Sequence, residues 1–369
     1  MIIPYVNLAN QYSLERKKLL KTIDKVLLKG IYIGGDEVDL FEKNIAKLCN
    51  TKYCVALNSG TDALVLALHS LGVRRGDEVI TTPNSFIAST AVIVHLGAKP
   101  VFVDVKPDQN IDCKKIVEKI TKKTKVIMAV HLTGRMCEMD KIINIAKKYN
   151  IKVVEDAAQS IGSMFKGNPS GSYGHVGCFS AHPLKNLNAL GDSGYLTTNS
   201  KKIRDYVKDL RSHGMTNRNV IRNFGYVSRM DNLQAAILNF RLKNLRNIIL
   251  KRRVNASLYS KFLDQKHVNL AEEKKDEFNT YHTFVIQVNN RDKLKKYLFK
   301  KGIQTAIHYP VPIHLQPACE YLRYKKGDFV ETELQSKKIL SLPIHQNLTE
   351  FQIKYISKNI NNFFKLYKS

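Results

Sequence analysis

The chain has 369 residues, 44% of them apolar and 25% charged, which is typical of a globular protein and excludes a disordered or fibrous one. Its net charge of +27 favours an anionic partner, although lysine-rich, solvated helix faces give the same balance. No apolar run is long enough for a membrane span, and the first residues lack the features of a signal peptide. We therefore expect a cytoplasmic protein that binds no membrane.

The six cysteines are scattered, without a CxxC pair, which predicts reduced, buried thiols and no metal site. The sequence also lacks a zinc finger, a basic zipper and the aromatic RNA-binding motif. We therefore expect no specific binding of nucleic acid, in spite of the charge.

The predicted elements begin with a basic amphipathic helix near the start of the chain, which we expect to pack across the body of the protein. From about residue 50 to residue 245, strands and helices alternate. The strands are rich in Val and Ile, and are predicted over 53–57, 78–82, 100–105, 125–130, 152–155, 177–181 and 194–198. The helices are predicted over 61–71, 86–96, 113–120 and 139–149. This alternation predicts an α/β fold, with a mostly parallel sheet and helices on both faces.

The pattern changes after this region. It predicts one long helix over 230–247, a charged stretch at 251–253, and then a shorter α+β pattern. That pattern comprises a strand over 283–288, a helix over 291–301, a strand over 304–308 and a final amphipathic helix with Ile353, Ile356, Ile360, Phe363 and Phe364 on one face. We therefore divide the chain into a large α/β domain, 1–250, and a small α+β domain, 251–369.

The glycines form neither a P-loop nor a GxGxxG dinucleotide motif. The first informative segment is 58–64, where a strand ends, a small-residue turn follows and a helix begins. Gly60 lets the backbone approach a ligand, Thr61 can cap the helix, and a free helix N-terminus binds phosphate. Taken alone, this segment is better explained as an ordinary helix cap.

Two further segments place reactive side chains after strands. Asp156 ends the apolar run of 153–160, at the sheet edge where ligands of α/β proteins bind, so it can meet a cationic group; a helix cap is the alternative. Lys185 follows the strand of 177–181, and a desolvated lysine there is a nucleophile; a solvated surface lysine is the alternative. Together, a phosphate site, an acid and a lysine are what pyridoxal 5′-phosphate (PLP) requires.

These motifs belong to a larger ordered set of segments: 58–64, 155–160, 179–187, 191–194, 225–231 with 233–236, and 308–318. With them the sequence resembles, over essentially its whole length, the DegT/DnrJ/EryC1/StrS family of PLP-dependent sugar aminotransferases. The resemblance implies the fold-type I architecture of the aspartate aminotransferase superfamily, with a seven-stranded, mostly parallel sheet. It also implies PLP as cofactor, pyridoxamine 5′-phosphate as its intermediate form, and a homodimer with active sites at the interface.

The resemblance further implies a role for each matching residue. Lys185 is the catalytic lysine, which binds the cofactor covalently and then moves the proton. Asp156 pairs with the pyridine nitrogen, Gln159 with the phenolic oxygen, and Gly60, Thr61 and Ser180 hold the phosphate. Phe86 stacks on the ring, although a core Phe on an amphipathic helix is the alternative. The candidate substrate-binding residues are Arg135, Arg229, His308, Tyr309 and His314.

The sequence departs from the family pattern at three positions. Val227 replaces an Asn that typically reaches the phosphate of the neighbouring subunit's cofactor, so its presence puts that contact in doubt. Leu184 stands where Thr is common. Arg135 stands where Gln is common, and we hypothesise that its guanidinium binds an acidic group of the substrate, with a solvated surface Arg as the alternative.

The predicted reaction converts a nucleotide-linked keto-sugar, preferably a 3-keto-sugar, into an amino sugar for surface glycans or polysaccharides. L-Glutamate is the expected amino donor and 2-oxoglutarate its product. One alternative is a sugar dehydratase, in which relatives replace the lysine by histidine; the presence of Lys185 argues against it. The other is a regulatory or binding protein on the same fold, which Val227 leaves open.

Overall fold

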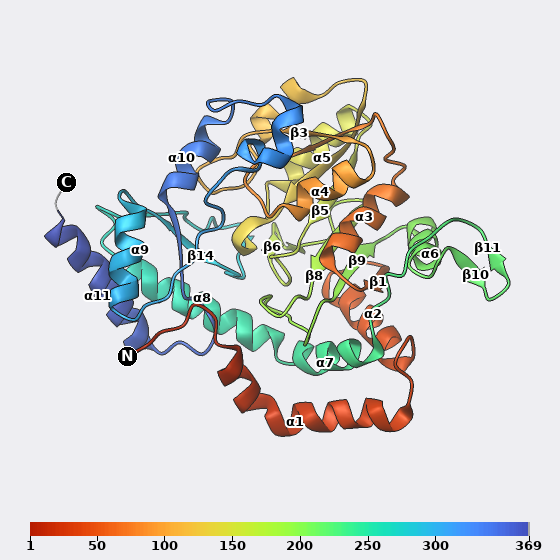
Figure 1. Ribbon diagram of the computed structural model, residues 1–369, viewed down its shortest axis with the longest axis horizontal. Helices are drawn as coiled ribbons and strands as arrows, with labels where there is room; N and C mark the ends of the chain where they lie inside the picture. The colour runs from red at the N-terminus through yellow and green to blue at the C-terminus, as the bar shows by residue number, and fades with distance from the viewer. Residues whose placement is uncertain (368–369) are drawn as a thin grey trace.

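The computed structural model describes residues 1–367, and its centre is a seven-stranded sheet in the order β1-β9-β8-β5-β4-β2-β3 (Figure 1). All strands of this sheet except β9 run in the same direction. The strand β9 lies between β1 and β8 and pairs antiparallel with both. The strands are β1 (Tyr53–Leu57), β2 (Glu78–Thr81), β3 (Lys99–Phe102), β4 (Thr124–Val130), β5 (Lys152–Asp156), β8 (Val176–Ser180) and β9 (Gly194–Thr198). The predicted mostly parallel α/β sheet is confirmed.

Helices cover both faces of this sheet because successive side chains of a strand point to opposite sides. In β1, Val55 and Leu57 join one apolar core, whereas Cys54 and Ala56 join another. The first core is closed by α3 (Gly60–Ser70), α4 (Ala88–His95) and α6 (Lys201–Leu210). The opposite face is covered by α2 (Asp36–Leu48), α5 (Met139–Lys148) and α7 (Asn232–Leu242). All six cysteines are buried and free, as predicted.

The C-terminal part has a core of its own around a small antiparallel sheet, β12-β14-β15. Its elements are α8 (Leu245–Phe262), β12 (Asn269–Leu270), β14 (Phe284–Gln287), α9 (Arg291–Lys300), α10 (Val330–Lys338), β15 (Ile339–Leu342) and α11 (Glu350–Leu366). The five residues predicted to share one face of the last helix are all buried. The smaller α+β part is therefore present as expected.

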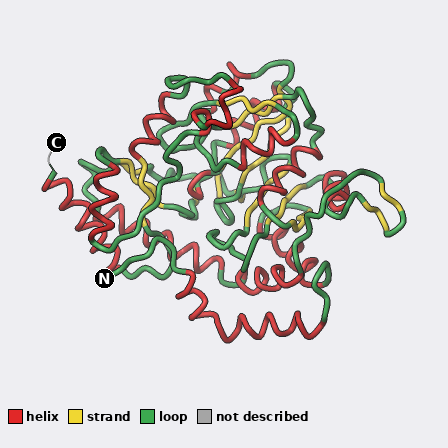
Figure 2. Tube along the Cα trace, in the orientation of Figure 1, coloured by secondary structure: helices red, strands yellow, loops and turns green. Residues whose placement is uncertain are grey.

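Several short elements complete the chain. The strands β6 (Met164–Phe165), β7 (Asn168–Pro169) and β13 (Glu277–Phe278) form a further small sheet. The hairpin β10 (Met215–Asn217) and β11 (Val220–Ile221) projects from the body, as Figure 2 shows. Within residues 1–367, five short 3₁₀ helices span Cys113–Lys115, Val117–Lys119, Leu132–Gly134, Ile313–Leu315 and Pro317–Leu322.

The first helix, α1 (Leu8–Lys29), packs against α7 and so lies across the body of the protein as expected. It buries only Leu19 and Val26, and Leu14 and Leu28 remain exposed. Among the helices of residues 1–367, none combines the length and the apolar character that crossing a membrane requires.

Three predicted elements are wrong. The single helix over 230–247 is two helices, because Asn244 leaves the helical conformation and α8 begins after it. Residues 113–120 form two 3₁₀ turns; of this segment only Cys113 and Ile116 are buried, which is too small an apolar face for a full helix. Residues 304–308 form only an isolated bridge, between Ala306 and Ser341.

The helix α8 connects the two parts of the protein. Its first turns place Leu245 and Ile249 in the core below the large sheet, and its later turns place Ala256 and Tyr259 in the C-terminal core. Residue 250, the proposed boundary between the domains, therefore lies inside a continuous helix. The division at this position remains a proposal.

Candidate active site

A cavity of about 410 Å³ lies where β1, β5 and β8 end. It brings together nine of the predicted site residues: Gly60, Thr61, Phe86, Asp156, Gln159, Ser180, Lys185, His308 and Tyr309. Arg135, Arg229 and His314 do not line it. Because parallel strands end at the same sheet edge, residues far apart in the sequence meet in this cavity.

The turn between β1 and α3 presents a helix N-terminus to the cavity. Ser59, not Thr61, caps the helix, since its hydroxyl accepts a hydrogen bond from the Asp62 backbone N–H at 3.0 Å. A Cβ at Gly60 would lie 2.7 Å from Cβ of Ser180, and one at Gly194 would lie 2.2 Å from the Ser59 carbonyl carbon. These two glycines let β8 and β9 approach the turn, and the exposed N–H groups there suit a phosphate.

Asp156 ends β5, and its carboxylate is held by hydrogen bonds. Its side chain is 5% exposed, Oδ2 accepts from the Ser89 hydroxyl at 2.7 Å, and Oδ1 accepts from the Ala158 N–H at 3.2 Å. Gln159 is also oriented, because its Oε1 accepts from the Thr133 N–H at 2.7 Å, which turns the amide nitrogen away from Thr133. A fixed carboxylate and a fixed amide donor therefore line one cavity.

Lys185 follows β8 in a turn closed by a hydrogen bond from its backbone N–H to the His182 carbonyl at 2.8 Å. Burial lowers the pKa of the Lys185 ammonium from its usual 10.5 to about 8, and the negative charge of Asp156 opposes part of this effect. A useful fraction of the amine is thus neutral near neutral pH, which is the form that attacks a carbonyl carbon.

Two half-buried histidines, His282 and His308, complete one wall of the cavity. Nδ1 of His308 lies 2.8 Å from the Ser341 hydroxyl, and burial, reinforced by the Lys185 charge, lowers the pKa of His308 to about 4. Burial also lowers the pKa of His282 well below its usual value, with further contributions from Lys185 and Arg252. Both imidazoles are therefore neutral at neutral pH. No motif surrounds His282, so the sequence does not predict it as a site residue.

Phe86 lies in the loop before α4, which begins at Ala88. Its side chain is 55% exposed, and its ring centre lies 6.0 Å from that of Tyr309 across the cavity. The alternative reading of Phe86 as a core residue on an amphipathic helix is therefore wrong.

Glu155, beside Asp156, is fully buried and supports the site from within the protein. Its two oxygens accept backbone N–H groups from Gly171, Tyr173 and Gly174, at 2.7 to 2.9 Å. Oε2 also accepts from Nε2 of His131 at 3.0 Å, because Nδ1 of that ring accepts the Cys137 N–H and so carries no proton. The Glu155 carboxylate thus faces partners in the interior of the protein, whereas the neighbouring Asp156 carboxylate faces the cavity.

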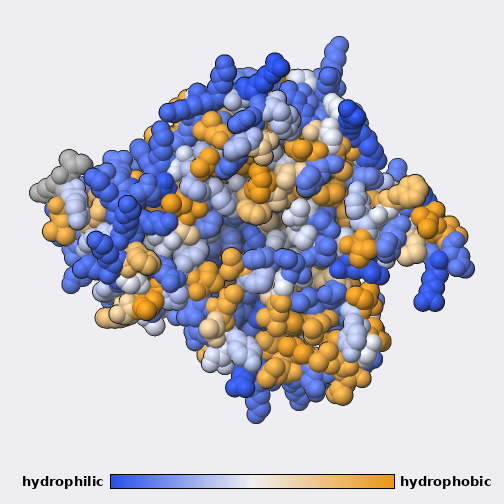
Figure 3. Space-filling view, in the orientation of Figure 1, coloured by the Kyte–Doolittle hydropathy of each residue, from blue (hydrophilic) through white to orange (hydrophobic). Residues whose placement is uncertain are grey.

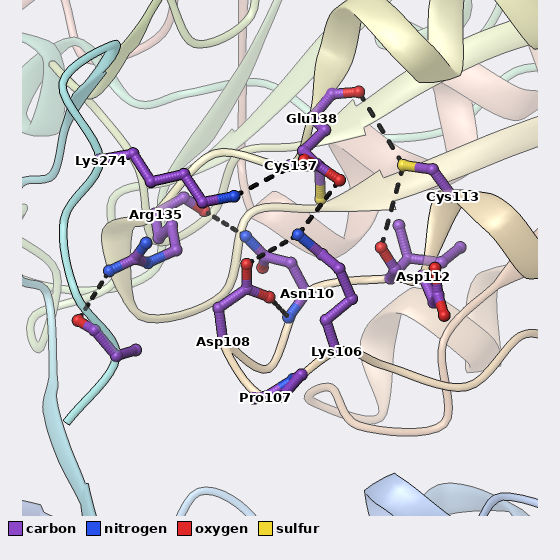
Figure 4. A network of polar contacts seen from close by, with 12 residues as sticks. Lys106, Pro107, Asp108, Asn110, Asp112, Cys113, Arg135, Cys137, Glu138 and Lys274 are labelled. Atoms are coloured by element: carbon purple, nitrogen blue, oxygen red, sulfur yellow. Dashed lines mark hydrogen bonds and ion pairs between the residues drawn. The ribbon is translucent and has the colours of Figure 1, made fainter. Parts of the chain in front are cut away.

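The remaining candidates lie elsewhere. Arg135 is 4% exposed, pairs with Oε2 of Glu277 at 2.5 Å, and donates to the carbonyls of Ala271 and Glu272 at 2.9 and 2.8 Å. Its own carbonyl accepts from Nδ2 of Asn110 at 3.3 Å, as Figure 4 shows. Arg135 is therefore not the solvated surface Arg of the alternative reading.

His314 is 2% exposed and contacts Glu333, with Nε2 and Oε1 3.1 Å apart.

The residues present fit PLP on their own chemistry. The helix N-terminus suits its phosphate, the Asp156 carboxylate suits its cationic pyridine nitrogen, and the amine of Lys185 suits its aldehyde. Within residues 1–367, no group of three or more His, Cys, Asp and Glu side chains could hold a metal ion.

The sheet with its one antiparallel strand and this site define a PLP-dependent enzyme of fold type I. More specifically, the chain belongs to the DegT/DnrJ/EryC1/StrS aminotransferase family, whose model matches residues 13–361.

Comparisons with known proteins cover nearly the whole chain. The "pleiotropic regulatory protein" of Geobacillus stearothermophilus is 37% identical, with 99% of each chain covered. The dTDP-3-amino-3,6-dideoxy-alpha-D-galactopyranose transaminase of Aneurinibacillus thermoaerophilus is 38% identical, covering 98% of this chain and 99% of the relative.

Two solved structures show the same fold. DesV of S. venezuelae, in complex with a ketimine intermediate, has a TM-score of 0.96 at 33% identity, with 98% of each chain covered. NtdA of Bacillus subtilis, with bound cofactor PMP, has a TM-score of 0.92 at 33% identity, covering 99% of this chain and 85% of its own. The protein is thus a member of a PLP-dependent sugar aminotransferase family.

Proposed function

We propose that this protein transfers the amino group of L-glutamate to the ketone of a nucleotide-linked keto-sugar, preferably at C3. The observation that carries the proposal is one cavity holding a desolvated lysine, an oriented carboxylate and a helix N-terminus. The Aneurinibacillus relative is named as a transaminase of a 3-amino sugar linked to dTDP. That name supports a substrate linked to a nucleotide and amination at C3.

When bound, PLP supplies an electron sink for the pair of electrons left when a proton leaves the carbon beside the amine. The amine of Lys185 would bind the aldehyde with loss of water, and would later accept and return that proton. The carboxylate of Asp156 would pair with the pyridine nitrogen, and the amide of Gln159 would donate to the phenolic oxygen. The N–H groups of Gly60 and Thr61, together with the hydroxyl of Ser180, would hold the phosphate, and Phe86 would cover the ring.

The substrate side of the cavity is assigned to His308, Tyr309 and the previously unpredicted His282. The two neutral imidazoles suit hydrogen bonds to sugar hydroxyls better than pairing with an anion. Arg229 stays a proposed substrate residue. His314 contacts Glu333 outside the cavity, so its position gives no support to a direct contact with the sugar.

We also propose a homodimer with active sites at its interface. Near the end of α1 the apolar side chains of Leu28, Ile31, Tyr32 and Ile33 are each about half exposed or more, and Figure 3 shows apolar surface gathered over this end of the molecule. Phe224, fully exposed, stands near the projecting hairpin. Exposed apolar area of this kind marks a protein interface. The excess of positive charge would draw a diphosphate-linked sugar to the dimer, most strongly at low salt.

The proposal is tested with the absorbance spectrum of the purified protein incubated with PLP. We expect a yellow protein that bleaches on addition of L-glutamate and regains its colour with a 3-keto-sugar nucleotide, faster than with the 4-keto isomer. Mass spectrometry of the product should show an amine in place of the ketone. A colourless protein would favour the regulatory or binding function, and a product that has lost a hydroxyl group would favour the dehydratase.

Capture of PLP by the apoprotein should depend on pH through Lys185. Below a pH of about 8 the amine is mostly protonated and unreactive, and above it the amine is mostly neutral. The rate at which the bound chromophore forms should therefore rise with pH and level off above about 8, as followed by stopped-flow absorbance. A rate that still rises at the usual lysine pKa would contradict the desolvation of this amine.

Arg135→Ala should destabilise the protein without changing KM for the keto-sugar. The substitution leaves Glu277, whose side chain is 4% exposed, as a buried charge without its partner, which costs about 3 to 5 kcal/mol. Denaturant unfolding and steady-state kinetics measure the two effects. Lys141→Ala is a control, since it removes a partner of Glu138 that is half exposed. A raised KM with unchanged stability would restore the hypothesis that Arg135 binds the substrate.

A further inference from the structure

Two buried serines, Ser85 and Ser89, lie next to Asp156 and are not yet used by the proposed chemistry. Ser85 is in the loop before α4 and Ser89 in the first turn of that helix, and they are 4% and 1% exposed. Oγ of Ser89 lies 2.7 Å from Oδ2 of Asp156, and Oγ of Ser85 lies 2.7 Å from Oγ of Ser89. The three side chains form a line of hydrogen bonds that ends on the carboxylate.

The direction of these bonds follows from their chemistry. An ionised carboxylate only accepts, so Ser89 uses its one hydroxyl proton on Asp156. Ser89 can then only accept from Ser85, which makes Ser85 the donor of the second bond. The Ala158 N–H donates to the other oxygen of Asp156. Both hydrogen bonds on this carboxylate therefore come from donors, as a negatively charged group requires, and the Ser85 bond polarises the Ser89 hydroxyl further.

We propose that Ser89, supported by Ser85, is a positioning residue that holds Asp156 ionised and in one rotamer, so that the proton shared with the cofactor's pyridine nitrogen stays on the nitrogen. This inference rests on the proposed function, in which Asp156 pairs with that nitrogen. The position of the proton matters because a protonated ring withdraws electrons more strongly than a neutral one. Without the serine hydroxyls, the shared proton moves toward the carboxylate.

The proton can be located directly with PLP labelled with ¹⁵N in its ring, because the ¹⁵N chemical shift differs between protonated and neutral pyridine. We expect the wild type to show a protonated nitrogen. Ser89→Ala should shift the proton distribution about tenfold toward the neutral ring, the effect of losing one hydrogen bond to a charged group. Ser85→Ala should shift it less, in the same direction.

A double-mutant cycle separates this line of hydrogen bonds from two independent effects. Because Ser85 reaches the carboxylate only through Ser89, the pair Ser85→Ala/Ser89→Ala should give the same ¹⁵N shift as Ser89→Ala alone. Additive shifts would mean that Ser85 acts by another route and would overturn its supporting role. If Ser89→Ala does not fold, Ser85→Ala alone still tests the direction of the effect.

Thr90→Val is the matched control. Thr90 is the next residue of α4, is 2% exposed, and its hydroxyl has no hydrogen-bond partner in the part of the chain that the structure describes. Thr90→Val should leave the ¹⁵N shift unchanged. A general effect of losing a buried hydroxyl from this helix would instead move the ¹⁵N shift in Ser89→Ala and in Thr90→Val alike. Thermal unfolding of each variant shows separately any loss of stability.

Asp156→Asn distinguishes a failure of the proposed function from a failure of the inference about the two serines. It should abolish protonation of the ring nitrogen, and if it leaves the ¹⁵N shift unchanged, the pairing assumed in the proposed function is wrong. If Asp156→Asn moves the shift and Ser89→Ala does not, the inference about the serines is wrong and the proposed function stands.

Discussion

Lys185→Ala should lower the rate of the reaction with L-glutamate by about 10² to 10⁴, the range for loss of a positioned acid–base group. The variant also lacks the amine that binds the cofactor covalently, so we expect PLP to be removed by gel filtration from the variant but retained by the wild type. Absorbance before and after addition of L-glutamate measures the first effect. Absorbance after gel filtration measures the second.

Two controls make the result specific to this amine. Lys295→Ala removes an exposed lysine of α9 and should change neither the spectrum nor the rate. Added methylamine should restore part of the activity of Lys185→Ala, because it supplies a free amine to the cavity. An unchanged rate in Lys185→Ala would show that another group moves the proton, and the proposed function would have to be abandoned.

Glu155→Ala should lower the free energy of unfolding by about 4 kcal/mol or more, or prevent folding. The fully buried carboxylate accepts three backbone N–H groups and the His131 ring, and each donor left unsatisfied costs about 1 to 3 kcal/mol. Denaturant unfolding followed by circular dichroism measures the change.

The control for this prediction is Glu350→Ala, which removes an exposed carboxylate at the start of α11 that pairs with the exposed Lys354. Its effect should stay within about 0.5 kcal/mol. If Glu155→Ala were equally mild, the donors around it would have to find other partners, and Glu155 would not be the group that supports the site from within the protein.

The sequence predicts the sheet well because its signals are local. The strands over 53–57 and 194–198 have the predicted bounds, since each apolar run ends at polar or glycine-rich turn residues. The break at Asn244 was missed because apolar residues continue at helical spacing on both sides of it. Periodicity reports a helical face and carries little information about where one helix stops and the next begins.

The site was predictable only where a side chain belongs to a motif. Lys185, Asp156 and Gly60 stand at the ends of predicted strands, and the cavity brings them together. Ser89 reaches Asp156 from 67 positions away, and Arg135 reaches Glu277 across 142. Contacts between such distant segments depend on how the elements pack in the folded protein, and a single sequence does not reveal that packing.

The continuity of α8 bears on how the chain loses its structure. Because one helix contributes Leu245 and Ile249 to one core and Ala256 and Tyr259 to the other, neither core can open without fraying a helix that the other still needs. The two parts should therefore unfold together, in a single cooperative transition. A fragment cut at residue 250 would begin with half a helix and an exposed apolar surface, which favours aggregation over independent folding.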